Sequence, residues 1–292
     1  MRVGITGASG LIGTALAPAL AAAGHDVIRF VRKPPESAGE RQWDATTLAP
    51  DAVGDLDALV HLAGAGVGDK RWSAAYKKVI FESRVNSTKA VASAVAHAGV
   101  PVLLSGSAVG IYGDAADRVL DEMAAAGSGF LAEVCVRWER ATEAADRHAR
   151  VVHLRTGIVQ SRRGGALARQ LPLFRAGLGA PLGDGRQWVS WISIRDEVAA
   201  IVHLLTADAS GPVNVVAPLA VTNRDYTKAL GRAVHRPTLP VGVPGAALRL
   251  ALGEFAGEVV SGQRVVPEVL ESSGFAFADR DVDAALAHAL EN

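Results

Sequence analysis

Three glycines near the amino end of the chain, Gly7, Gly10 and Gly13, have the GxxGxxG spacing of a loop that binds the diphosphate of a dinucleotide. The first permits a tight turn, the second lets a phosphate approach the main chain, and the third allows a helix to pack closely on a strand. A helix over Leu11–Ala23 would direct its unpaired amides and the positive end of its dipole toward the phosphates. A glycine turn that merely joins a strand to a helix is the alternative. No Gly-Lys-Ser/Thr sequence closes the loop, so it is not a Walker loop.

The segments around these glycines have the order that a dinucleotide-binding fold requires. Val3–Thr6 is an apolar, β-branched strand, the Ala/Leu-rich helix ends at Gly24, and a second strand is predicted over Asp26–Val31. This order of strand, glycine turn, helix and strand favours cofactor binding over a purely structural turn.

Two basic residues, Arg32 and Lys33, follow the second strand, where a site that prefers NAD has an acidic residue. A guanidinium beside an ammonium favours a 2′-phosphate by charge and by bidentate geometry, so the sequence predicts NADP as the cofactor. A solvated basic loop is the alternative. Near the end of a third strand, Asp44 could accept a hydrogen bond from the adenine amino group or lie in an ordinary surface turn.

Small residues and one hydroxyl mark the ends of the next two strands. Leu62, Ala63 and Gly64 would let the main chain lie against the cofactor at the carboxyl edge of a sheet. Ser107 places a hydroxyl at the same edge, beside the expected nicotinamide position, whereas His61 is more readily explained as a structural residue.

Composition narrows the class of protein. Thirty basic residues balance thirty acidic ones, so no global field attracts nucleic acid or an anionic membrane surface. The one cysteine, Cys135, excludes an internal disulfide and a cysteine-only metal cluster, which suits a reducing compartment. We find no signal peptide and no apolar run long enough to span a bilayer, and we expect a cytoplasmic protein that binds no metal.

Strand-like runs alternate with helical stretches through the first half of the chain. The strands are predicted at 3–6, 26–31, 58–62, 100–104 and 151–154, and the helices at 11–23, 74–98 and 131–147. Such alternation predicts an α/β fold, a Rossmann-like doubly wound parallel sheet with a smaller, mostly helical C-terminal lobe. We expect residues 1–160 to form the NADP-binding core and residues 161–292 the substrate-binding and C-terminal lobe, partly interleaved with the core.

Segments along the whole chain support a closer comparison. They are AGAGVGDKRW (63–72), ESRVNST (82–88), FLAEVCVRWE (130–139), RTGIVQSRRGGAL (155–167), GDGRQWVSWISIRDEV (183–198), GPVNVVAP (211–218) and GFAF (274–277). In these segments and over essentially its full length, the chain resembles the extended short-chain dehydrogenase/reductases, the nucleotide-sugar epimerase/dehydratase superfamily. Within that superfamily it is similar to the atypical branch of epimerase family proteins.

The resemblance implies a set of cofactor contacts. Gly7, Gly10, Leu11 and Ile12 would contact the pyrophosphate, Arg32 the 2′-phosphate, and Leu62 with Ala63 the central ribose region. Arg84 and Val159 would line the cofactor site. We add Ser9, Gly13, Lys33, Asp44 and Gly64 to the residues expected there. A Ser or Thr at the position of Ser107 helps to hold a reacting oxygen in the wider superfamily.

The superfamily's acid/base pair is absent from this chain. That pair is the Tyr of a Tyr-x-x-x-Lys helix, with the ammonium lowering the pKa of the phenol. The three tyrosines, Tyr76, Tyr112 and Tyr226, are followed four places on by Ile80, Ala116 and Leu230. Matching Glu139 to the acidic residue that follows the motif puts Leu131 and Cys135 at the Tyr and Lys positions.

A replacement acid would have to come from nearby, and the candidates are Glu133, Tyr112, Lys70 and Arg71. Our hypothesis assigns the role to Glu133, because a carboxyl buried near a cofactor can have its pKa raised into a useful range. A helix-surface or ion-paired glutamate is the alternative.

Two functions of different classes follow. The first is an NADP-binding oxidoreductase or epimerase-like enzyme that acts by hydride transfer on a small polar, nucleotide-sugar-like substrate, with Ser107 polarising an oxygen. The second is a catalytically impaired NADP(H)-binding sensor or regulatory protein. A homodimer that pairs through helices 74–98 and 131–147, and a monomer with the same faces in its core, both fit the sequence.

Overall fold

A sheet of seven parallel strands forms the centre of the computed structural model, which describes residues 1–291. Its order is β11-β7-β5-β4-β1-β2-β3. The strands are β1 (Arg2–Thr6), β2 (Asp26–Val31), β3 (Glu40–Gln42), β4 (Ala58–His61), β5 (Val102–Ala108), β7 (Arg150–Thr156) and β11 (Gly211–Val215). The chain builds outward from β1 to β3 and then returns at β4 to build the other half. Strand order therefore reverses between β1 and β4, where open α/β sheets bind their ligands.

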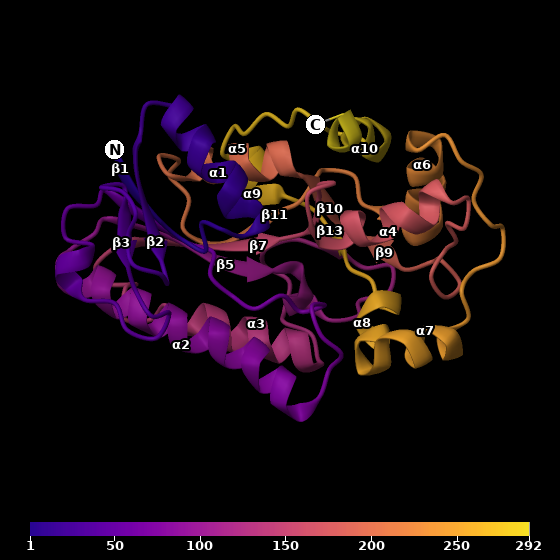
Figure 1. Cartoon of the computed structure of the whole chain (residues 1–292), viewed down its shortest axis with the longest axis horizontal. Helices are drawn as coiled ribbons and strands as arrows, with labels where there is room; N and C mark the ends of the chain where they lie inside the picture. The colour runs from indigo at the N-terminus through magenta and orange to yellow at the C-terminus, as the bar shows by residue number, and fades with distance from the viewer. Residues whose placement is uncertain (292) are drawn as a thin grey trace.

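Helices cover both faces of this sheet. α1 (Leu11–Ala22) and α5 (Ile194–Leu204) lie on one face, and α2 (Ala74–Ala98) and α3 (Phe130–Arg140) on the other (Figure 1). The expected Rossmann-like, doubly wound α/β fold is confirmed.

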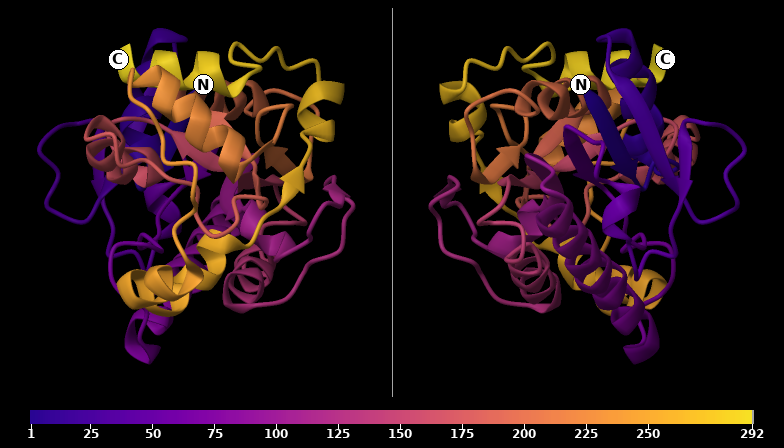
Figure 2. Two further views of the ribbon diagram at one scale, coloured as in Figure 1. Left: turned by 90° about the vertical axis from the view of Figure 1, so that its right-hand side faces the viewer. Right: turned by 90° about the vertical axis from the view of Figure 1, so that its left-hand side faces the viewer.

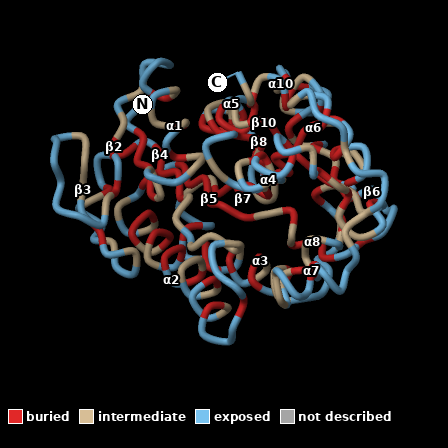
Figure 3. The backbone as a smooth tube through the Cα atoms, turned by 45° about the vertical axis from the view of Figure 1, so that its right-hand side comes forward, coloured by how far each residue is buried: buried red, intermediate tan, exposed pale blue. Residues whose placement is uncertain are grey.

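Alternate strand residues supply the two layers of the core. Val60 and Leu104 pack in the cluster under α1 and α5, whereas their neighbours Leu59 and Leu103 pack in the cluster that includes α2. This period of two is the one that a sheet buried on both faces requires. The strands accordingly form the buried centre of the molecule, and exposed backbone lies mostly on the outer helices and loops (Figure 3).

The second half of the chain adds short elements beyond the sheet, mostly helical (Figure 2). The helices are α4 (Gly165–Arg175), α6 (Asn223–Ala233), α7 (Gly245–Leu252), α8 (Ala256–Val260), α9 (Glu268–Ser272) and α10 (Val282–Glu291). The short strands of this half are β8 (Ile158–Gln160), β9 (Trp188–Val189), β10 (Trp191–Ser193), β12 (Val221–Thr222) and β13 (Arg264–Val265), and β13 pairs with β6 (Val119–Leu120) from the first half. Three 3-10 turns complete the described elements: η1 (Pro50–Ala52), η2 (Val109–Tyr112) and η3 (Gly253–Phe255). No helix within residues 1–291 has the length and apolarity needed to cross a membrane.

The largest differences from the predicted boundaries concern β5 and α3. β5 continues past its predicted end at Leu104, because it pairs in register with β7 from Val102 and Arg150 to Ala108 and Thr156. The helix predicted to reach Arg147 ends at Arg140 and is followed by turns. There the hydroxyl of Thr142 donates to the carbonyl oxygen of Glu139, which satisfies one of the free carbonyls at the helix end.

Candidate functional site

Glycine is required at two positions here, one in the turn between β1 and α1 and one in the first turn of α1. Gly7 has a φ of +68°, and a Cβ there would come within 2.7 Å of the carbonyl carbon and oxygen of Leu62. A Cβ on Gly13 would overlap the carbonyl oxygen of Gly7. The amide of Gly10 donates to that same oxygen at 2.9 Å, which closes the turn. The expected roles of these glycines as turn and packing positions therefore have a steric basis.

The amino end of α1 is left open by the sequence. Gly10 is the N-cap residue, no side chain caps the helix, and its first turn carries no acidic residue. The first amides of Leu11 and Ile12 and the positive end of the dipole are thus not neutralised by the protein itself. Ser9 is exposed beside them. Such an end fits a phosphate group, so the residues present fit the diphosphate of a dinucleotide.

The segment after β4 forms the neighbouring wall of this site. Leu62 and Ala63 lie against Gly7, and Gly64 lies against the side chain of Arg84 from α2, with a Cβ position 3.4 Å from it. Arg84 is half-buried and donates to the carbonyl oxygen of Ala65 at 2.9 Å. The structure therefore brings these four predicted cofactor residues to one edge of the sheet.

Arg32 and Lys33 stand free at the end of β2. Both are exposed, and neither forms an ion pair in the described part of the chain, whereas Arg29 on the same strand pairs with Glu40 at 2.8 Å. Two unpaired cations at the carboxyl end of β2 fit a phosphate on the adenosine ribose.

The carboxylate of Asp44 stabilises the turn that follows it. Its carboxylate accepts hydrogen bonds from the amide and the hydroxyl of both Thr46 and Thr47, at 2.6 to 2.9 Å. These four bonds hold the pKa of Asp44 well below its usual range. Its expected contact with adenine stays a prediction.

Val159 lies in β8 and packs against the core cluster that lines α1. The turn after β8 reaches the start of α1, where a Cβ on Gly164 would be 3.2 Å from the side chain of Leu11. The second half of the chain thus meets the glycine turn through this segment.

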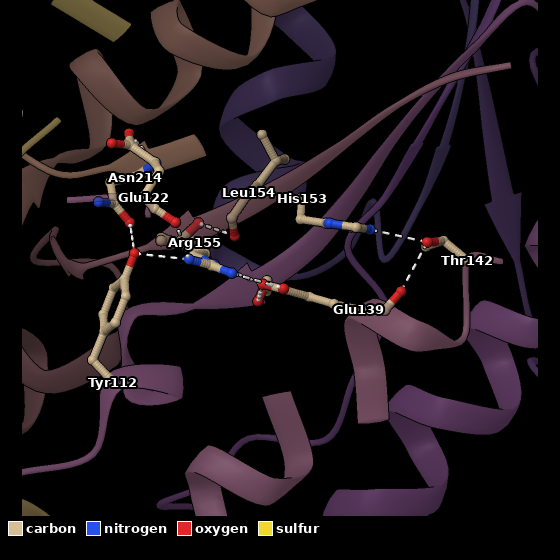
Figure 4. A network of polar contacts seen from close by, with 10 residues as sticks. Tyr112, Glu122, Glu139, Thr142, His153, Leu154, Arg155 and Asn214 are labelled. Carbon is tan, nitrogen blue, oxygen red and sulfur yellow. Dashed lines mark hydrogen bonds and ion pairs between the residues drawn. The ribbon is translucent and has the colours of Figure 1, made fainter. Parts of the chain in front are cut away.

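Ser107 lies in a different environment, beside a buried polar network between β5, β7 and α3. Figure 4 shows the part of this network around Arg155 and Glu139. Its hydroxyl donates to Glu139 Oε1 at 2.7 Å, and Arg155 binds both oxygens of Glu139 at 2.9 and 3.0 Å. Arg155 also donates to the hydroxyl of Tyr112 at 2.9 Å, which in turn donates to Asn214 at 2.7 Å. Because the one hydrogen of Ser107 is already donated, its oxygen in this arrangement can act only as an acceptor.

The ion pair between Arg155 and Glu139 determines the charge state of Glu139 in this network. Burial raises the pKa of Glu139, but the hydrogen bonds and charge of Arg155 outweigh it and hold that pKa below its ordinary value. Glu139 is therefore an ionised partner of Arg155. The other buried carboxyl of the network, Glu122, has a pKa raised by burial and accepts a bond from the amide of Asn214 at 2.9 Å.

The hypothesis for Glu133 depended on burial, and the structure does not provide it. Glu133 is exposed on the outer side of α3 and lines a surface groove with Lys77 and Glu82 of α2. Helix α3 turns Val134 and Trp138 inward instead. The premise of the hypothesis, a carboxyl buried near the cofactor, is therefore missing, and we no longer assign the acid role to Glu133.

The positions matched to the missing Tyr and Lys are apolar. Leu131 packs in a cluster with Trp72, Tyr76 and Ile80, and Cys135 is buried. Burial raises the pKa of the Cys135 thiol to about 12, so it stays a neutral thiol. Motif spacing on α3 gave no sign that Tyr76 of α2 lies in the same cluster as Leu131.

Comparison with known proteins places the chain in a class. Residues 3–217 match the model of the NAD dependent epimerase/dehydratase family, and residues 243–289 match a domain of unknown function, DUF1731. The chain therefore belongs to the NAD-dependent epimerase/dehydratase family, and within it to the branch of epimerase family proteins that the sequence resembles.

Its similarity to members of that branch extends over the full length. The chain is 49% identical to the epimerase family protein MT2273 of Mycobacterium tuberculosis, over 98% of this chain and 97% of that protein. The crystal structure of human epimerase family protein SDR39U1 with NADPH is 31% identical, has a TM-score of 0.91 and covers all of both chains. A nucleoside-diphosphate sugar epimerase from Corynebacterium glutamicum is 39% identical with a TM-score of 0.83, covering 99% of this chain and 58% of that one.

Proposed function

We propose that this protein is an NADP-dependent oxidoreductase or epimerase-like enzyme that transfers hydride to or from a small polar, nucleotide-sugar-like substrate. The observation behind the proposal is the uncapped amino end of α1 beside Gly7 and Gly10, which offers main-chain amides and no competing carboxylate. Membership of the family, together with the crystal structure of the human relative with NADPH, supports the same cofactor class.

The choice of NADP over NAD rests on Arg32 and Lys33. Their side chains carry no carboxylate partner within residues 1–291, and a 2′-phosphate would supply a negative partner. NADP, when bound, supplies or accepts the hydride, while the protein binds and orients it.

The cofactor assignment is tested by calorimetry with NADPH and NADH on Arg32→Ala. We expect the variant to lose about 1 to 3 kcal/mol of NADPH binding, as for a charged hydrogen bond, and to leave NADH binding nearly unchanged. Arg29→Ala is the matched control, because Arg29 lies on β2, just before Arg32, and is paired with Glu40. Equal losses for both cofactors would contradict the phosphate assignment, and no heat with NADPH at millimolar levels would end the proposal.

A second candidate function is a sensor that binds NADP(H) without turnover. It is favoured by the apolar residues Leu131 and Cys135 at the acid/base positions and by the occupied hydrogen of Ser107. Nicotinamide absorbance separates the two functions, because an enzyme oxidises or reduces its bound cofactor when given the right alcohol or carbonyl compound. Tight binding with no absorbance change across a broad panel would favour the sensor.

The partner and location remain proposals of the same kind. The balance of thirty basic and thirty acidic residues favours a small-molecule partner over nucleic acid or a membrane surface. We place the protein in the cytoplasm, as a monomer or as a homodimer through α2 and α3.

A further inference from the structure

A phenol and a guanidinium from α2 are held on neighbouring carbonyl groups of the loop that leaves β4. The hydroxyl of Tyr76 donates to the carbonyl oxygen of Gly66 at 2.6 Å, and Arg84 donates to that of Ala65 at 2.9 Å. The hydroxyl of Ser83 fixes the same loop by accepting from the amide of Ala65 at 3.0 Å. Two adjacent peptide groups thus fix where the phenol and the cation lie.

Arg84 places its guanidinium in a partly buried position without a negatively charged partner in the described part of the chain. It is half-buried, its guanidinium lies 5.1 Å from the ring centre of Trp138, and no carboxylate pairs with it among residues 1–291. Burial lowers its pKa, whereas the thiol of Cys135 and the phenol of Tyr76 act in the opposite direction. A cation taken partly out of water without a counterion is costly, so it is expected where a negative charge forms or binds.

Burial, more than the charged groups that face Tyr76, keeps the phenol protonated in the resting protein. Burial and the carboxylate of Asp69 raise the pKa of Tyr76, while Arg84 and Arg169 lower it, and the net direction is upward. Asp69 is itself paired with Arg169 at 2.7 Å, and the ammonium of Lys70 lies 5.9 Å from the ring centre of Tyr76. A protonated phenol beside a cation is the arrangement of a proton donor.

The other two phenols lie in other parts of the molecule and donate to buried side chains. Tyr112 donates to Asn214 inside the network around Arg155, and Tyr226 donates to Gln160 at 2.8 Å in the core of the second half. Tyr76 alone of the three contacts the cluster that contains Leu131 and the loop that continues from Gly64.

We propose that Tyr76 is the proton donor of the enzyme and that Arg84 stabilises the phenolate left after the transfer. This rests on the proposed function. NADPH, when bound, supplies the hydride that adds to the carbon of an aldehyde or ketone. The hydroxyl of Tyr76 exchanges its acceptor, the carbonyl oxygen of Gly66, for the carbonyl oxygen of the substrate, which takes the proton. The electrons of the broken O–H bond stay on the phenolate beside Arg84, and water returns the proton. The substrate class is therefore a carbonyl compound, or its alcohol in the reverse direction.

The test reads the phenol directly and needs no substrate. Labelling the full chain with 3,5-difluorotyrosine gives three fluorine NMR signals whose phenols titrate nearer neutrality, and Tyr76→Phe identifies one of them. If that variant does not fold, Tyr112→Phe and Tyr226→Phe identify it by elimination. The titration is run on the apoprotein and with NADP+, NADPH and adenosine 2′,5′-bisphosphate, which lacks the nicotinamide.

We expect NADP+ to lower the Tyr76 midpoint by about half a pH unit or more relative to adenosine 2′,5′-bisphosphate, because the oxidised nicotinamide ring is cationic. NADPH should not lower it, and the Tyr112 and Tyr226 signals should not move. Arg84→Gln should raise the Tyr76 midpoint in the apoprotein, and Arg84→Lys should leave it close to that of the wild type.

A protein that binds NADP+ and shows the same Tyr76 midpoint with both ligands would overturn the assignment of Tyr76 while leaving the cofactor proposal standing. A midpoint that does not respond to Arg84→Gln would overturn the role of Arg84. Failure to bind either nicotinamide cofactor, seen separately as the absence of binding heat, would remove the proposed function and this inference with it.

Discussion

The carboxyl edge of the sheet has two halves, one formed mainly by main chain and the other by side chains. Around β1 and β4 the walls are main chain, because Gly7 and Gly13 lie so close to neighbouring peptides that no side chain fits. Around β5 and β7 the edge is made of side chains, in which Ser107, Glu139 and Arg155 bind one another through buried hydrogen bonds.

The difference predicts how each half responds to substitution. A main-chain site depends on backbone shape, so it tolerates changes of outward-facing side chains and fails when a Cβ is added. A side-chain network depends on paired charges, so it fails when one partner is removed.

The largest effect is expected from breaking the buried ion pair. Arg155→Met removes the cation and leaves the carboxyl of Glu139 without its counterion in a site where the two side chains are only 9% and 12% exposed. We expect a loss of about 3 to 5 kcal/mol in the free energy of unfolding, measured by urea denaturation.

Arg232→Met is the matched control, because Arg232 pairs with Asp283 on the surface, where the two side chains are 61% and 52% exposed. That exposed pair should contribute less than about 1 kcal/mol. Similar losses in the free energy of unfolding in the two variants would mean that the buried ion pair of Arg155 and Glu139 stabilises the protein no more than an exposed pair does.

The second effect is a pH dependence in the main-chain half. His61 is fully buried, hydrogen-bonded to Thr6 at 2.7 Å and to Thr88 at 3.0 Å, and burial lowers its pKa to about 3. The unfolded chain, with an ordinary imidazole, binds the extra proton first, so stability is present above pH 6.5 and is lost as the pH falls toward 3. Between pH 7 and pH 4 we expect His61 to account for a loss of about 3 kcal/mol in the free energy of unfolding.

Denaturation at both pH values, in wild type and in His61→Asn, measures this contribution. The variant should lose less stability over the same interval. His97→Asn removes an imidazole from an exposed position at the end of α2 and should keep the wild-type slope. An unchanged slope in His61→Asn would show that other groups control the acid transition.

The same contrast explains what the sequence could predict. The order of strands and helices and the glycine turn follow from short-range patterns, because spacings of two, three and four residues report which faces are buried. The extent of β5 was missed because its pairing partner, β7, begins at Arg150, far along the chain. The end of α3 was missed because the chain continues in turns whose bonds, such as the one from the Thr142 amide to the Glu139 carbonyl, span nearly the same short spacing as those of a helix.

The expected cofactor residues come from the same short-range patterns, and their contacts with a cofactor stay predictions, whereas the partners of Ser107 could not be predicted in this way. Ser107 lies 32 residues from Glu139, and Tyr112 lies 102 residues from Asn214, so no spacing relates them. The search for an acid on α3 led to Glu133, although the phenol that packs on Leu131 comes from α2.

A smaller effect is expected from adding one methyl group to the glycine turn. Gly7→Ala places a Cβ against the main chain of Leu62 in a left-handed conformation, and we expect a loss of about 2 kcal/mol in stability. NADPH should no longer raise the midpoint of thermal unfolding, because the diphosphate site is displaced. Gly24→Ala is the matched control, since Gly24 has a φ of +82° but nothing within 4 Å of its Cβ position. It should unfold slightly earlier yet keep the full response to NADPH, and a lost response in both variants would contradict a main-chain site at Gly7.

The smallest effect is expected at the residue that the sequence favoured as the catalytic acid. Glu133 and Glu139 lie on the same helix, six residues apart, one exposed on its outer side and the other paired with Arg155. Glu133→Gln should change the free energy of unfolding by less than about 0.5 kcal/mol and leave the NADPH affinity unaltered, since an exposed side chain loses only solvated contacts. Glu139→Gln makes the same chemical change inside the network and should destabilise the protein strongly, because it leaves Arg155 without a counterion. Denaturation measures the free energy of unfolding of the two variants, and calorimetry measures their NADPH affinity. A loss of NADPH binding in Glu133→Gln alone would show that the outer side of α3 belongs to the cofactor site.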